Sequence, residues 1–185
     1  MSQGAGTTLA GPTPRRLSAL ALALAPWLAG ACAEEEDPLS AEVLQQIGRS
    51  QGDAVGSDRA GVYLLAGDAG PCDCPEVGGL DLCGALAFDA PAWPAQVYQH
   101  EGLMVLDIAP VLTLYGRLDA DGAFVVAAIR SADSLGSQGE ILGRVDGAFD
   151  GDTFSGELRL RLQAEYVGQD PVDCGASSSL SAQRL

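Results

Sequence analysis

The sequence predicts an all-β fold, an antiparallel up-and-down meander of about seven or eight strands that closes into a barrel or a sandwich. A short helix and a tether are expected before it. Apolar and polar residues alternate with a period of two beyond residue 61, most clearly over 153–166, as in strands half buried in an antiparallel sheet. Asp-Gly turns separate the alternating runs, for example at 119–122 and 150–152, and tolerate the positive φ of tight hairpins.

The composition limits the possible functions. The chain has 185 residues, 47% of them hydrophobic and 19% charged, so it can bury one core. Acidic residues number 25 and basic residues 10, all of them Arg, which gives a net charge of −15. This charge disfavours binding to phosphate backbones, and a chain without Lys cannot form a G-x-x-x-x-G-K-[ST] loop. No catalytic, cofactor or metal site is predicted, because no nucleophile stands in a recognisable setting.

Residues 1–31 are predicted to form a signal peptide. Arg15 and Arg16 supply a positive region, and an apolar stretch follows from Leu17 to Ala29. Its 13 residues are too few to cross a bilayer, which takes about 20. The arginine pair is also similar to a twin-arginine export signal, although the bulky residue expected after it is missing.

Residues 28–32, LAGAC, resemble a bacterial lipobox, in which the cysteine is alkylated by diacylglycerol before cleavage in front of it. The segment departs from the family at Ala29, where Leu is preferred. With its acidic composition, the chain resembles small cysteine-stapled β lipoproteins of bacteria. The resemblance implies that Cys32 carries lipid, with acyl chains such as palmitate, and anchors the protein in the cell envelope, on the outer membrane or the periplasmic face. The alternative is an A-x-A site at 31–33 that releases a soluble secreted protein starting at Glu34.

Residues 32–60 are predicted to form a lipidated tether that includes a short helix. The acidic run at 34–37 repels itself and stays extended. Apolar residues then recur at spacings of three and four over 39–47, with Pro38 suited to a first helical position. The polar, Gly-rich segment 48–58 is predicted to be a linker.

Residues 61–185 are predicted to form the β domain. Its strands are expected at 61–66, 95–100, 103–109, 111–118, 123–130, 139–149, 153–166 and 178–184. Two hypotheses for the barrel interior differ in what they predict for four side chains: Leu114, Phe124, Val145 and Leu160. A ligand carrier predicts that these side chains line a cavity, and a structural domain predicts that they fill the interior.

Apart from the lipobox cysteine, the chain has four: Cys72, Cys74, Cys83 and Cys174. An even number in an exported protein predicts two disulfides. A bridge between Cys72 and Cys74 would close a small strained ring, so two pairings remain open. These are Cys72 with Cys83 plus Cys74 with Cys174, or Cys74 with Cys83 plus Cys72 with Cys174. Either pairing ties the loop 67–84 to the C-terminal segment.

Other candidate sites have simpler explanations. A metal site of the three cysteines in 72–83 with His100 is disfavoured, because a C-x-C pair lacks the gap typical of zinc sites. The aspartates at 119–122 and 150–152 lack the full D-x-D-x-D-G pattern of a calcium loop, and hairpin turns explain them. His100 is expected to be an exposed hairpin residue. Trp93, between two prolines, is expected to plug the open end of a barrel or to line a pocket.

The leading hypothesis is a cell-envelope lipoprotein with a non-enzymatic structural or partner-binding β domain. A second hypothesis is a small apolar-ligand carrier, because Gly61-Val62-Tyr63 is similar to the start of lipocalins, which bind apolar ligands in an eight-stranded barrel. A third is a secreted hydrolase with two carboxylates, one of raised pKa. The expected partners are the membrane, through the lipid anchor, and a protein or a small apolar ligand, but no nucleic acid.

Overall fold

The computed structural model describes residues 36–131, 137–168 and 170–185. Its elements, in chain order, are α1 (Ala41–Arg49), β1 (Gly61–Cys72), β2 (Glu76–Val77), β3 (Leu80–Asp81), α2 (Leu82–Leu86), β4 (Ala90–His100), β5 (Leu103–Ile108), β6 (Leu112–Leu118), β7 (Ala123–Ser131), β8 (Ser137–Asp150), β9 (Thr153–Tyr166) and β10 (Val172–Arg184). The predicted signal peptide and Cys32 lie outside the described residues.

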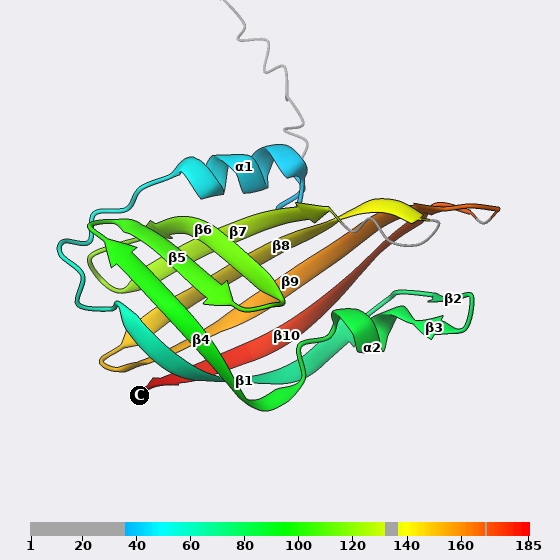
Figure 1. Cartoon of the computed structure of the whole chain (residues 1–185). Helices are drawn as coiled ribbons and strands as arrows, with labels where there is room; N and C mark the ends of the chain where they lie inside the picture. Colours follow the sequence, from blue (N-terminus) through cyan, green and yellow to red (C-terminus); the bar gives the residue numbers. More distant parts are fainter. Residues whose placement is uncertain (1–35, 132–136, 169) are drawn as a thin grey trace, which may run out of the picture. The chain divides into compact units, whose positions relative to one another are not determined.

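Eight of the strands within these ranges close into an antiparallel barrel (Figure 1). Their order is β1-β10-β9-β8-β7-β6-β5-β4, and β4 pairs back to β1. The predicted meander is confirmed, and it forms a barrel rather than a sandwich. The small hairpin of β2 and β3 lies outside the barrel order.

Strand β9 shows how the alternating sequence produces the barrel. Leu158 and Leu160 are buried in the interior, whereas Arg159 and Arg161 extend from the outer face. Three strands exceed the predictions by five or six residues: β1 continues to Cys72, β4 begins at Ala90, and β10 begins at Val172. The early part of β10 consists of small residues with weak strand propensity, and its pairing with β9 imposes the strand.

The predicted short helix is present and packs on the outside of the barrel. Ser40 caps α1, since its Oγ accepts a hydrogen bond from the Val43 N–H at 3.3 Å. Leu44 is buried against Ala127 and Leu142 on the outer faces of β7 and β8. Within the described ranges, each helix is too short or too polar to span a bilayer.

The segment between α1 and β1 is held against two hairpin turns. The Gly52 N–H donates to the Gly102 carbonyl at 2.9 Å, and the Ala54 N–H donates to the Leu118 carbonyl at 3.2 Å. A Cβ on Gly102 would lie 2.0 Å from the Gly52 carbonyl oxygen, so only glycine permits this approach. The predicted linker therefore follows a defined path beside the barrel.

The loop between β1 and β4 contains structure that the sequence analysis did not predict. It holds the β2–β3 hairpin and α2, and two disulfides staple it as Cys72–Cys83 and Cys74–Cys174. This is the first of the two pairings left open. Both bridges consume the thiols of the alternative metal site. Leu82 and Leu86 of α2 form a second apolar cluster with the last part of β9 and the first part of β10.

Replacing Cys74 and Cys174 together by Ser is expected to destabilise the barrel more than replacing Cys72 and Cys83 together. The two bridges join residues that are 100 and 11 positions apart. Chain entropy assigns roughly 4.7 kcal/mol to a loop of about 100 residues and up to about 3 kcal/mol to one of about 15 or fewer. Urea unfolding of the two double variants should show this order. The reverse order would mean that the Cys72–Cys83 bridge stabilises the folded protein mainly by holding the native contacts of α2.

Candidate ligand pocket at the barrel mouth

Aromatic rings close one end of the barrel. Tyr63, Phe124, Phe149 and Phe154 pack with ring centroids 5.2 to 6.0 Å apart. The Arg59 guanidinium lies 5.6 Å from the centroid of the Phe149 ring. The Tyr63 hydroxyl donates to the Arg59 carbonyl at 2.9 Å, and burial raises the pKa of this phenol. We call this the closed end.

From the closed end to its middle, the barrel is filled by its own side chains. Leu114, Phe124 and Val145, three of the four test positions, are at most 1% exposed and belong to one continuous apolar core. The fourth, Leu160, is 7% exposed and lies toward the opposite end. Three positions therefore behave as expected for a structural domain, whereas Leu160 borders open space.

That space is a pocket of about 220 Å³ at the end of the barrel opposite the aromatic rings, which we call the mouth. Its wall combines the end of α2, the loop that follows it, residues of the strands and the turn between β5 and β6: Ala85–Ala90, Trp93, Ile108, Val111, Leu112, Leu158 and Leu160. Asp89 is the ionisable side chain in this wall. An apolar pocket with few polar groups is typical of a small-molecule site.

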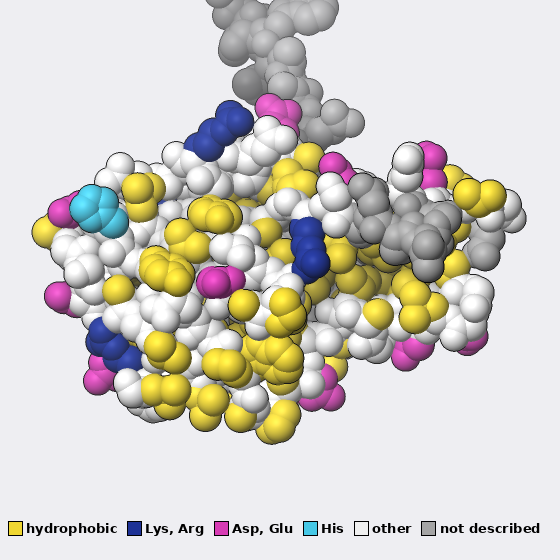
Figure 2. All heavy atoms as spheres, viewed as in Figure 1, with side chains coloured by type: hydrophobic (Ala, Val, Ile, Leu, Met, Phe, Trp, Pro, Cys, Tyr) yellow, Lys and Arg dark blue, Asp and Glu magenta, His cyan; other side chains and the backbone are white. Residues whose placement is uncertain are grey.

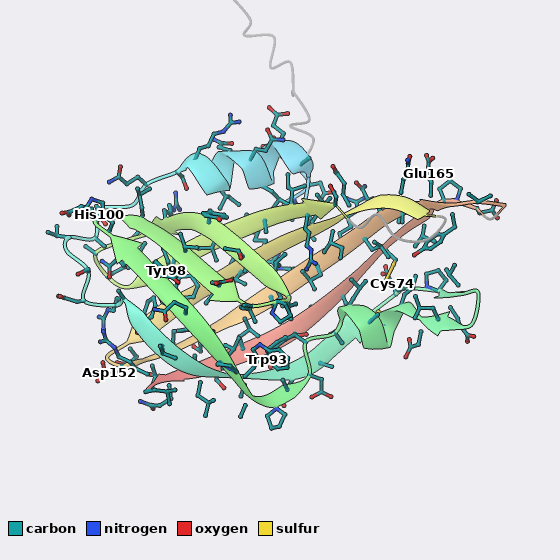
Figure 3. All side chains as sticks on the ribbon, viewed as in Figure 1. Cys74, Trp93, Tyr98, His100, Asp152 and Glu165 are labelled. Atoms are coloured by element: carbon teal, nitrogen blue, oxygen red, sulfur yellow. A yellow bond between two sulfur atoms is a disulfide. The ribbon has the colours of Figure 1, made fainter. Side chains whose placement is uncertain are left out.

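Trp93 forms one side of the mouth. It lies opposite Leu65 in the β1–β4 register and contacts the main core. Its indole N–H donates to the Ala109 carbonyl at 3.2 Å, and its ring meets Phe88 edge to face at 6.5 Å. Figure 3 places Trp93 near the start of β4 and His100 at the other end of that strand. The indole thus narrows the opening and also lines the pocket, as the sequence analysis allowed.

Residues 84–90, which we call the flap, comprise the end of α2, the loop after it and the first residue of β4, and residues 85–90 line the pocket. Phe88 fixes the flap, since its backbone N–H donates to the Ser178 Oγ at 3.0 Å and Ser178 is only 2% exposed. The Phe88 ring rests against Gly67, where a Cβ would lie 2.3 Å from a ring carbon. This contact could not be predicted from the sequence, because nothing local in the Gly- and Pro-rich loop links Phe88 to strands far along the chain.

Charged pairs gather on the outer face of β8, β9 and β10. Arg161 donates to both carboxylate oxygens of Asp173 at 2.5 and 2.6 Å, and this hydrogen bonding is the main reason that the pKa of Asp173 is lowered. Asp146 accepts from two arginines, Arg144 at 2.6 Å and Arg159 at 3.0 Å. The shift at Asp173 is opposite to the raised pKa that the hydrolase hypothesis requires of its acid.

The remaining candidates of the sequence analysis have structural roles or are exposed. His100 is exposed at the end of β4. Asp121 accepts a hydrogen bond from the Ala123 N–H at 3.0 Å, and Gly122 has a φ of 91°, as expected for a turn. In the ranges that the structure describes, no group of three or more His, Cys, Asp or Glu side chains is placed to hold a metal ion.

An apolar row crosses the outer face of β4, β5 and β6. Tyr98 lies opposite Val105, and Val105 lies opposite Tyr115, so the three side chains are neighbours across adjacent strands. Tyr98 is 55% exposed and Tyr115 is 51% exposed. Figure 2 shows apolar side chains spread across the face that these strands form. This outer row ends at Ala127, which α1 covers.

Comparisons with protein families, with curated proteins and with solved structures found no match.

Ser178→Ala is expected to loosen the flap. The substitution leaves the Phe88 N–H buried without its acceptor, which costs about 1 to 3 kcal/mol. Ser179→Ala is the matched control, because this neighbouring side chain is exposed on the outer face and should change stability by less than about 0.5 kcal/mol. Urea unfolding and hydrogen exchange of the Phe88 amide should both separate the two variants. Equal protection of that amide in both would contradict the role of Ser178.

Proposed function

We propose that the chain is a lipid-anchored protein of the bacterial cell envelope whose β-barrel has a structural or partner-binding role rather than a catalytic one. The filled interior of the barrel supports a structural or partner-binding role. Leu114, Phe124 and Val145 occupy the volume in which a wide barrel would hold a substrate. The barrel's stability and its outer surfaces then remain as the means by which it acts.

The two disulfides support an exported protein, because thiols stay reduced in most cytosols. The lipobox-type segment that ends at Cys32 supplies the anchor. A bacterial lipoprotein carries two or three acyl chains, and two chains suffice for stable anchoring, whereas one binds only marginally. The location follows as the outer membrane or the periplasmic face of the envelope. Cleavage before Glu34 would instead give a soluble secreted protein with the same barrel.

The outer row of Tyr98, Val105 and Tyr115 supports partner binding. Tyrosine is enriched at protein interfaces, since it combines a large apolar ring with a hydroxyl that tolerates water. A protein partner fits this face better than an anionic lipid surface, because the net charge of −15 opposes approach to anionic lipid.

The second candidate function is a small apolar-ligand carrier, favoured by the pocket at the mouth. The flap and Trp93 shape a partly enclosed apolar space where the filled core ends. This carrier differs from the expected one in the place of the ligand, which lies under the flap instead of in the middle of the barrel.

Replacing Cys32 tests the anchor. The full chain, produced in a bacterium supplied with alkyne-tagged palmitate, should take up the tag and fractionate with membranes. Cys32→Ala should lose the tag and enter the soluble fraction, because the thiol that accepts the diacylglyceryl group is removed. Ala29→Leu, which installs the residue that lipoboxes prefer, is the matched control and should keep or increase the tag. A chain that starts at Glu34 without lipid would instead establish the secreted alternative.

A further inference from the structure

We infer that the mouth pocket binds the compact apolar end of an uncharged amphipathic molecule, and that the ligand enters past the flap. This inference rests on the second candidate function, the apolar-ligand carrier. It adds the size of the apolar group, the charge of the head and the route of entry.

The volume of the pocket sets the size of the apolar group. About 220 Å³ exceeds a cavity of about 150 Å³ lined by Leu, Ile and Phe, which suffices for benzene. It is smaller than the roughly 300–1,000 Å³ pockets that enclose drug-sized ligands. A short alkyl chain or a single ring therefore fits, and the rest of a longer molecule stays outside.

The rim sets the charge of the head. Asp89 lines the pocket and opposes an anionic head. Arg130 opposes a cationic head, since its Nη1 donates to the Pro110 carbonyl at 3.2 Å and also to the Val111 carbonyl at the same rim. Either charge would also lose hydration beside the apolar wall. A hydroxyl or amide head avoids both penalties.

The flap is fixed at both of its ends and held to the barrel between them, as is expected of a segment that opens and closes over a pocket. The Cys72–Cys83 bridge ends immediately before it and fixes its first residue, and β4 begins at its last residue, Ala90. Between these two points, Leu86 packs in the second apolar cluster, and Phe88 is attached through one hydrogen bond to Ser178 and ring contacts with Gly67 and Trp93. A ligand that enters here displaces Phe88 from these contacts, while Leu86 holds the start of the flap in place.

The pocket contains its own spectroscopic reporter. The sequence has two tryptophans, Trp27 and Trp93, and Trp27 lies in the predicted signal peptide. In a Trp27→Phe/Cys32→Ala chain, prepared without detergent, Trp93 is the single emitter and no lipid is attached. Emission from the pocket wall then reports directly on occupancy.

Octanol, octanoate and octylamine are the probes, because they share one alkyl chain and differ in the charge of the head. Octanol should shift Trp93 emission saturably, with a Kd at least about tenfold lower than those of the two charged probes. If octanoate or octylamine bound as tightly as octanol, the preference for an uncharged head would be wrong, but the carrier function would still be supported. The absence of a saturable shift with all three, and with benzyl alcohol, would overturn the pocket and the carrier function together.

Two leucines on β6 locate the bound probe. Leu112 lines the pocket, whereas Leu118 is buried at the other end of the same strand. Leu112→Ala enlarges the pocket and should shift the preferred alkanol to a longer chain, whereas Leu118→Ala should leave the preference unchanged. Equal effects would place the probe elsewhere and overturn the assignment. Ile108→Val, a smaller change in the same wall, replaces Leu112→Ala if that variant does not fold.

The dissociation rate of octanol tests whether the ligand enters and leaves past the flap. Ser178→Ala removes the hydrogen bond that holds the flap, so octanol should leave at least about fivefold faster than from the parent chain. Ser179→Ala should leave the rate unchanged. Equal rates in the two variants, with binding intact, would overturn entry past the flap.

Discussion

Strand β1 closes the barrel, and the other features of the molecule depend on how it does so. Its first half pairs with both β4 and β10, which removes the two open edges that an eight-stranded meander would otherwise expose. Its contact with β4 ends at Gly67, whereas its pairing with β10 continues to Cys72. The strands thus separate at one end only. The chain between them fills this gap with α2 and the flap, and the disulfides hold it there.

The meander was predictable because each strand carries a local signal. Alternation of apolar and polar residues marks the strands, and Asp-Gly turns mark the hairpins, so neither depends on distant parts of the chain. The start of β10 was missed since residues such as Gly175 and Ser177 have weak strand propensity, and their conformation comes from pairing with β9. The structure of the loop depends on which cysteines pair, and sequence spacing left two pairings open.

The candidate site was predictable only in part. Trp93 attracted attention as a large aromatic residue between prolines, and Leu160 was expected to face the interior. Alternation indicates which side chains point inward, but it gives no depth along the barrel axis, because depth depends on the stagger between strands. Leu160, beside the pocket, therefore could not be distinguished by alternation from Leu114, in the filled interior. Phe88 was missed because its partner Ser178 is 90 residues away.

The ion pair between Asp37 and Arg161 fixes where the chain joins the barrel. Arg161 neighbours Leu160 of the pocket wall, so the first described residues lie at the level of the mouth, and α1 then leads away toward the turns that Gly52 contacts. Because Arg161 also binds Asp173, a pull on the segment before α1 would be transmitted through this arginine to β9 and on to β10. The same strand, β9, supplies Leu158 and Leu160 to the pocket wall, so tension on that segment would act on the wall as well.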